Sequence, residues 1–258
     1  MLPSVFVSHG APNLLLQDVP ARHFLEDLGR SQPRPKAILA VSAHWETAGV
    51  RVGTASRPAT IHDFGRFDDR LFAMRYPAPG DPALADRVQD LLSEAGLAAA
   101  ADPARGLDHG VWVPLTLMYP DADIPVVPVS VQSALGPAHH LQLGRALAPL
   151  RAEGVLVLAS GSFTHDLGRF RGRALEEAAP EDVDAFAGWF DAALTERRVT
   201  DLLGYRSRAP FAAENHPTEE HLLPLFAALG AAGPDARADR LHSSTTHGVL
   251  RMDAYAFH

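Results

Sequence analysis

The sequence contains no cysteine, which removes several kinds of site at once. Disulfides, cysteine-ligated zinc, iron–sulfur clusters and thiol nucleophiles all need a sulfur that this chain does not have. Any bound metal must therefore be held by histidine, aspartate or glutamate. The 13 histidines among 258 residues provide many such ligands.

The chain also lacks an excess of positive charge, since 23 lysines and arginines stand against 31 acidic residues, for a net charge of −8. Such a balance does not neutralise phosphates, so we expect no nucleic-acid partner. No apolar run reaches membrane-spanning length, and residues 1–8 lack the pattern of a signal peptide. We therefore expect no membrane partner and a cytoplasmic location. The oligomeric state stays open.

Short apolar runs alternate with amphipathic segments along the whole chain. The pattern predicts strands at 5–7, 37–44, 50–54, 123–131, 154–160 and 248–257, and helices at 19–30, 82–96, 111–118, 137–152, 180–202 and 217–229. This alternation predicts a single α/β domain over residues 1–258, with a central mixed, mostly parallel sheet flanked by helices on both faces. Residues 58–82 form a long loop rich in proline, glycine and aromatic residues, and a connection of that length is usually functional.

Three of the predicted strands deliver a histidine: His9, His44 and His165. Ligands in open α/β sheets bind outside the carboxyl ends of the strands, and imidazole is the commonest metal ligand of proteins. For His9 or His44 alone, a histidine bonded to a backbone carbonyl is the better interpretation. Together they favour metal ligation, and we predict a mononuclear metal centre.

The segment from Asn215 to His221 adds two histidines and two glutamates. The zinc-protease helix motif needs histidines four residues apart. Here the spacing is five, about 140° around a helix, so His216 and His221 are not expected to ligate together. We expect Pro217 to start a helix whose first turn places His221 as one ligand, although a solvated position fits His221 alone better.

Further histidines suggest acid–base chemistry. His165 could be a ligand, a general base or an edge histidine. Asp108 beside His109 could raise the pKa of that imidazole, as an acid–base group requires, but a simple turn fits equally well. His62 could face a ligand from the long loop, although a solvated loop position is the safer interpretation. The histidines at 23, 139, 140, 242 and 258 are expected at the surface.

A set of motifs in a fixed order resembles a known family. They are Ser8-His9-Gly10-Ala11-Pro12, Ser42-Ala43-His44-Trp45, Thr60-Ile61-His62-Asp63-Phe64, Tyr76-Pro77-Ala78-Pro79-Gly80, Asp108-His109-Gly110, Tyr119 through Val126, Thr164-His165-Asp166-Leu167 and Pro217 through His221. The chain resembles the DODA-type (DOPA extradiol) dioxygenases of the class III extradiol, LigB-like superfamily. The resemblance covers nearly the whole chain and implies the same α/β fold.

The resemblance also implies roles for individual residues. His9, His44 and His221 match the metal ligands; His165 matches an acid–base histidine that can also close on zinc as a fourth ligand; His109 matches a second catalytic histidine. Ring-cleaving members of the wider superfamily use two histidines and one glutamate, which suit Fe(II). Here His221 stands at the third position with Glu220 adjacent. Fe(II) is expected for activity, and Zn(II) also suits an all-histidine site.

The implied substrates are a small catechol, DOPA-like, and O₂. His62, Phe64, Phe67 and Tyr76 of the long loop could cover an apolar pocket over the metal. Arg206 or Arg208 could pair with a substrate carboxylate. Two alternatives stay open: a zinc-dependent hydrolase with His165 as base, and a non-catalytic binding protein on the same scaffold.

Overall fold

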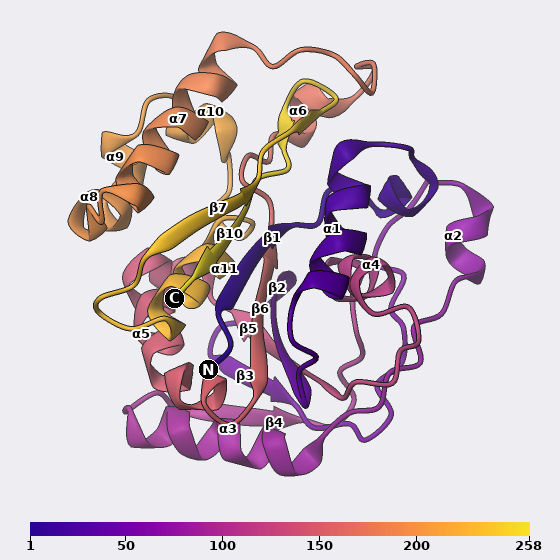
Figure 1. Cartoon of the computed structure of the whole chain (residues 1–258), viewed down its shortest axis with the longest axis vertical. Helices are drawn as coiled ribbons and strands as arrows, with labels where there is room; N and C mark the ends of the chain where they lie inside the picture. Colours follow the sequence, from indigo (N-terminus) through magenta and orange to yellow (C-terminus); the bar gives the residue numbers. More distant parts are fainter.

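The computed structural model describes residues 1–258 and is built on one eight-stranded sheet of order β4-β3-β5-β2-β6-β1-β10-β7 (Figure 1). The strands are β1 Ser4–Ser8, β2 Ala37–Glu46, β3 Val50–Gly53, β4 Ala99–Asp102, β5 Val126–Val131, β6 Val155–Gly161, β7 Ala238–His242 and β10 Ala254–Phe257, beside a small pair, β8 Thr245–Thr246 and β9 Leu250–Arg251. Four of the seven neighbouring pairs in the large sheet are parallel and three are antiparallel. The predicted mixed, mostly parallel sheet is confirmed.

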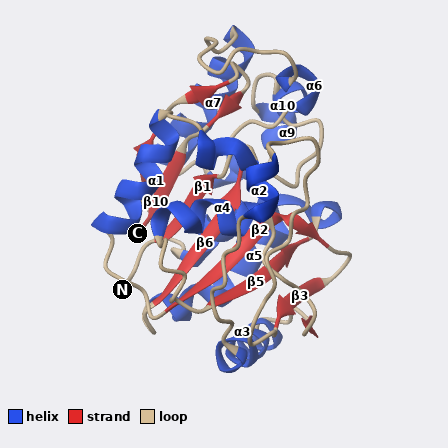
Figure 2. Cartoon of the chain, turned by 90° about the vertical axis from the view of Figure 1, so that its right-hand side faces the viewer, coloured by secondary structure: helices blue, strands red, loops and turns tan.

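Helices cover both faces of this sheet, with α1 and α4 in front and α5 behind in Figure 2. Their bounds are α1 Pro20–Ser31, α2 Asp69–Ala73, α3 Pro82–Glu94, α4 His109–Met118, α5 Gly136–Leu147, α6 Leu167–Phe170, α7 Glu181–Thr195, α8 Val199–Leu203, α9 Tyr205–Arg208, α10 Ala212–Asn215 and α11 Leu223–Ala231. None of them is long and apolar enough to cross a membrane.

The central strand β2 shows why both faces need helices. Its side chains alternate: Ile38 and Ala40 pack in one apolar cluster with α1 and α4, whereas Leu39 and Val41 pack in another with α3 and α5. All four are fully buried. Successive side chains of a strand point to opposite faces, so a strand that is apolar throughout requires cover on both sides.

Several predicted bounds differ from the structure. The helix expected from Pro217 begins at Leu223, because the Pro in its first turn is Pro224 and the residues before it form turns. The helix expected over 180–202 is interrupted at Arg197, whose φ of 58° is not a helical conformation. α8 then continues the chain.

Two edge strands were not predicted. β4 and β7 are short and only partly buried. β4 is a run of alanines, which are depleted in strands, and β7 is mostly polar, so neither has the β-branched pattern that identifies a buried strand. The strand expected over 248–257 is divided into β9 and β10, and β10 pairs antiparallel with β1 so that the two ends of the chain lie side by side (Figure 1).

The order of the central strands positions the site. β6 lies between β1 and β2, and both pairs are parallel. The carboxyl ends of these three strands therefore meet at one edge of the sheet. These are the three strands whose ends carry His9, His44 and His165.

Candidate metal centre

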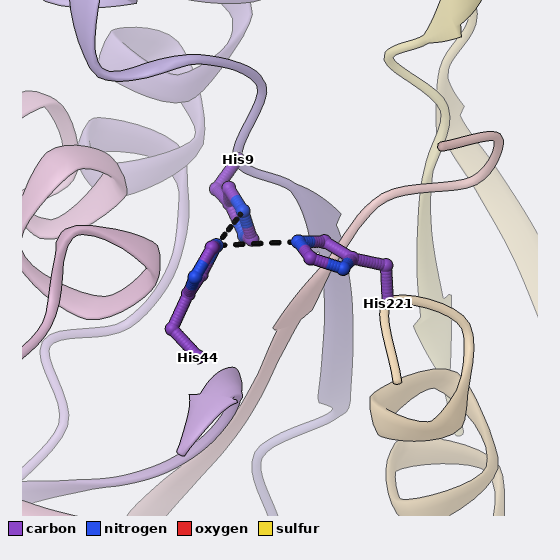
Figure 3. A group of neighbouring side chains, drawn as sticks. All are labelled: His9, His44 and His221. Atoms are coloured by element: carbon purple, nitrogen blue, oxygen red, sulfur yellow. Dashed lines mark hydrogen bonds between the residues drawn. The ribbon is translucent and has the colours of Figure 1, made fainter. Parts of the chain in front are cut away.

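Three imidazoles converge at this edge (Figure 3). His9 follows β1, His44 lies in the last part of β2, and His221 comes from the turn before α11. The Nε2 atom of His44 lies 3.0 Å from Nε2 of His9 and 3.2 Å from Nε2 of His221. One ligand atom from each residue lies within 4.8 Å of the others. The three histidines that the sequence grouped as ligands thus lie together.

Gly161 at the end of β6 explains how His221 reaches this position. The amide of Ser162 donates to the His221 carbonyl oxygen at 2.9 Å, and a Cβ atom on Gly161 would lie 2.0 Å from that same oxygen. Only glycine permits so close an approach of two backbones. His221 is held by this backbone contact, and its expected place in the first turn of a helix is wrong.

The Nδ1 atom of each imidazole faces its own acceptor. His9 Nδ1 is 3.0 Å from Ser160 Oγ, and the Ser160 hydroxyl gives its one proton to the Gly110 carbonyl, so it accepts from His9. His44 Nδ1 is 3.3 Å from Asp63 Oδ2. His221 Nδ1 is 2.9 Å from a Glu220 oxygen (Oε1). Acceptors at Nδ1 fix the tautomer that leaves the Nε2 lone pair free.

Burial keeps these imidazoles neutral. Burial, reinforced by the neighbouring histidines, lowers the pKa of His9 and His221 well below the usual value. The same causes lower the pKa of His44 to about 3. Neutral rings with Nε2 lone pairs that face one another repel unless a cation lies between them. Ligand nitrogens bound at ~2.0–2.1 Å with angles of about 90–110° lie roughly 2.9–3.3 Å apart, so the observed spacing fits a bound divalent metal.

His165 lies beside this group. Its ring stacks on that of His221 with centroids 3.4 Å apart, and its Nδ1 atom is 4.0 Å from Glu220 Oε1. Burial lowers the pKa of His165 to about 4. The ring is therefore a neutral proton acceptor near pH 7.

The partner of His109 is Asp63 and not the adjacent Asp108. Asp63 Oδ1 accepts from His109 Nδ1 at 2.9 Å and from the His109 amide at 3.0 Å. Burial raises the pKa of Asp63, but the bonds and charge of His109 outweigh it and lower the pKa to about 2. The buried Asp108 carboxylate turns instead to Ser42 Oγ and to Arg105. Sequence reasoning missed the role of Asp63, although it lies in the loop marked as functional.

A short parallel bridge carries that loop to the site. The amide of Ile61 donates to the carbonyl of Leu107 at 2.7 Å, and the amide of Leu107 donates to the carbonyl of Ala59 at 2.8 Å. This pairing aligns residues 59–61 with the segment just before His109. Asp63 is thereby placed two residues beyond the bridge, between His44 and His109.

A cavity of about 240 Å³ opens above the imidazoles. An apolar cavity of about 150 Å³ can hold benzene, so this one has room for a substituted ring. Its wall is formed by His9, Gly10, Ala11, Pro12, His44, Asp63, Phe64, Gly65, Phe67, His109, Ser162, His165, Leu167, Phe170 and Leu250. The predicted Phe64 and Phe67 belong to this wall. His62 does not; its Nε2 atom lies 3.1 Å from the carbonyl oxygen of Met74.

Other residues expected near the substrate lie elsewhere. Tyr76 is buried, and its hydroxyl donates to the carbonyl of Tyr119. Arg206 donates to backbone carbonyls, and Arg208 is paired with Asp201. None of the three lines the cavity, because Tyr76 is bonded to the distant Tyr119 and the two arginines are bonded to groups nearby in the chain. Sequence spacing alone could not reveal those partners.

Two further histidines are buried for structural reasons. His216 Nε2 bonds the carbonyl of Phe163 at 3.0 Å and belongs to no ligand cluster. His140 bonds the Gln132 amide through Nε2 and the Gly136 carbonyl through Nδ1. The expected surface position of His140 is therefore wrong, because this capping role draws it into the core.

Comparison with known proteins agrees with this arrangement. The family described as "Catalytic LigB subunit of aromatic ring-opening dioxygenase" matches residues 4–257. The sequence is 44% identical to the 4,5-DOPA dioxygenase extradiol of Beta vulgaris, over 98% of this chain and 95% of that protein. It is 40% identical to the protein of the same name in Escherichia coli K12, over 89% and 85%. The crystal structure of an uncharacterized protein from Escherichia coli K12 matches with a TM-score of 0.83 at 35% identity and covers 99% of both chains. The chain therefore belongs to the family of catalytic LigB subunits of aromatic ring-opening dioxygenases.

Proposed function

We propose that this protein is a metal-dependent extradiol dioxygenase that opens the ring of a small, DOPA-like catechol with O₂. The observation that carries the proposal is the convergence of three Nε2 atoms, from His9, His44 and His221, beside a ring-sized cavity that His9 and His44 help to line. Two more histidines, His165 and His109, stand in the wall of the same cavity. The names of the curated relatives support the substrate class, since they describe action on DOPA.

His9, His44 and His221 would hold one divalent metal, which when bound supplies Lewis acidity that lowers the pKa of a catechol hydroxyl and, as iron, the redox chemistry that O₂ requires. Ser160, Asp63 and Glu220 keep the three rings in the ligating tautomer. The protein thus contributes to metal binding by holding three neutral ligand nitrogens in place before the metal binds.

His165 is the group proposed to take the remaining catechol proton. Its ring lines the cavity, is held parallel to His221 and lies near the Glu220 carboxylate. After His165 accepts a proton, Glu220 at 4.0 Å stabilises the positive charge. His165 is also the proposed fourth ligand when zinc fills the site.

His109 is proposed to hold a proton opposite its bond to Asp63. The Asp63 carboxylate accepts from Nδ1, which leaves Nε2 as the atom that can exchange a proton with a reacting oxygen. Phe64, Phe67 and Phe170 form the apolar wall around the same space. They exclude water and press a planar ring against the imidazoles.

The decisive experiment is anaerobic loading of metal-free protein with Fe(II) or with Zn(II), followed by measurement of oxygen uptake and the absorbance of ring-opened product. Fe(II) is expected to give uptake, whereas zinc cannot change redox state and should give none. His44→Ala serves as the inactive control. His23→Ala replaces an exposed histidine outside the site and serves as the matched control that should keep activity. If neither metal supports uptake while zinc supports ester or amide hydrolysis, the protein is a hydrolase.

A further inference from the structure

The cavity above the imidazoles has no cationic side chain that could pair with a charged substrate tail. Its 15 wall residues include neither lysine nor arginine, and its one carboxylate, Asp63, is occupied by His44 and His109. The outer part of the wall is apolar. A catechol that carries an amino-acid head could therefore seat its ring here, but its charged end must lie elsewhere.

A second cavity adjoins the first through a shared wall. Phe67 and Phe170 belong to both. The remaining residues of the second wall are mostly polar: Asn13, Leu16, Gln17, Arg66, Asp68, Arg70 and His247. A side chain that extends past the two phenylalanine rings would leave the apolar space and enter this polar one.

The polar cavity contains one unpaired cation. Asp68 binds Arg70 through two hydrogen bonds, at 3.0 and 2.8 Å, so those two charges cancel. Arg66 is exposed and forms no ion pair or side-chain hydrogen bond. Its guanidinium is therefore free to bind a carboxylate with two parallel hydrogen bonds.

Two residues of the same wall, Asn13 and His247, each carry a buried acceptor that no group of the protein satisfies. Asn13 Oδ1 and His247 Nε2 are buried and have no hydrogen-bond partner. His247 Nδ1 lies 3.1 Å from the carbonyl of Arg173 and donates to it, so Nε2 carries a lone pair. A buried acceptor without a protein partner requires a hydrogen-bond donor from outside the protein, either water or a ligand. Five other buried polar atoms of the chain also lack a partner, but Asn13 and His247 are the two that lie in the wall of this cavity.

Backbone strain gathers at the same place. Five residues other than glycine have a positive φ, and two of them, Arg66 at 58° and His247 at 53°, line this cavity. Such conformations cost of order 1–3 kcal/mol and cluster at ligand clamps. The two strained residues come from separate loops and belong to the wall of one cavity.

We propose that this second cavity binds the zwitterionic head of a catechol α-amino acid, with Arg66 on the carboxylate and with the side chains of Asn13 and His247 turned from their buried positions toward the ammonium group. The inference rests on the proposed function for the position of the ring. It assigns the tail a site of its own and makes Arg66, Asn13 and His247 the residues that select amino-acid catechols over simple ones.

The test is binding without turnover. Calorimetry on the full chain compares L-tyrosine with tyramine, which lacks the carboxylate, and with 3-(4-hydroxyphenyl)propionate, which lacks the ammonium group. L-Tyrosine is expected to bind roughly 10-fold more tightly than either, as one lost charge-assisted contact implies. Arg66→Gln should remove the preference over tyramine, and Asn13→Ala the preference over the propionate. Arg171→Gln, an exposed arginine outside both cavities, should change neither.

Equal binding of the three compounds, or identical behaviour of Arg66→Gln and Arg171→Gln, would overturn the assignment. This outcome is separable from a failure of the proposed reaction, because no metal chemistry takes place in the assay. If the binding preference holds but no catechol is opened, the tail site stands and the dioxygenase proposal falls. If catechols are opened but binding shows no preference for the amino-acid head, the dioxygenase proposal stands and the tail site falls.

Discussion

Substitution of Asp63 by asparagine isolates the role of this carboxylate in metal binding. Asp63 Oδ1 accepts two hydrogen bonds from His109, whereas Oδ2 faces Nδ1 of His44 at 3.3 Å. In Asp63→Asn the amide oxygen takes the place of Oδ1, where it still accepts both hydrogen bonds from His109. The amide NH₂ group must then face His44. His44 Nδ1 then becomes an acceptor, and its proton moves to Nε2, the atom that would bind the metal.

The size of the effect follows from the cost of losing a residue that orients a ligand, which is typically ~10–100-fold in metal affinity, or about 1.4–2.7 kcal/mol. Competition for Zn(II) with a chromophoric chelator at neutral pH measures this directly. Asp69→Asn, at the exposed first residue of α2, removes the same charge away from the site and should leave the affinity unchanged.

A second variant separates the tautomer from the charge. Asp63→Ala loses the same negative charge but presents no NH₂ group to His44, so the ring can still adopt the ligating tautomer with water at Nδ1. We expect Asp63→Ala to bind Zn(II) more tightly than Asp63→Asn. The opposite order, or an Asp63→Asn affinity equal to that of Asp69→Asn, would refute the reasoning.

Three other predictions follow from the same geometry. His165→Ala should lower catechol turnover by ~10²–10⁴ while metal content stays intact; complete loss of the metal would identify His165 as a structural ligand. Gly161→Ala should destabilise the fold by ~1–3 kcal/mol, since its Cβ would lie 2.0 Å from the His221 carbonyl oxygen. Gly49→Ala is the control, because there is open space around that residue. Equal urea midpoints for the two variants would count against this close approach. Burial lowers the pKa of His140 to about 4 and of His216 to about 3. As the pH falls below ~6.5, these two histidines therefore bind protons in the unfolded chain before they do so in the folded protein. The free energy of unfolding of metal-free protein should fall by up to about 1.4 kcal/mol per pH unit for each group as the pH drops from 6.5 towards 4, and urea unfolding that is constant from pH 7 to 5 would contradict it.

The sequence by itself determined the central architecture. The apolar runs around residues 38–41, 126–131 and 155–159 can be buried only as central strands covered on both faces, and the structure places them so. Because the carboxyl ends of parallel neighbours share one edge, two strand-end histidines already marked the site. The third, His221, was predicted from its motif and from a helix start at Pro217, but the structure places it in the turn before α11.

What the sequence did not determine were contacts between segments far apart in the chain. Nothing local distinguishes Asp63 from Asp108 as the partner of His109. A bridge of two hydrogen bonds between residues 59–61 and Leu107 makes that choice. Tyr76 is aromatic enough to bind a substrate, yet it is bonded to the distant Tyr119. Arg206 and Arg208 also have suitable side chains, but the packing of their own segment bonds them to nearby groups.

The physical reason is the range of the interactions. Burial and strand alternation depend on the order of consecutive residues, so the sheet and its histidine-bearing edge can be predicted from the sequence. The direction of a single hydrogen bond depends on which loop lies across from it, within a few tenths of an ångström. Only the packed tertiary structure sets that distance, and with it the tautomers of the imidazoles and the two cavities beside them.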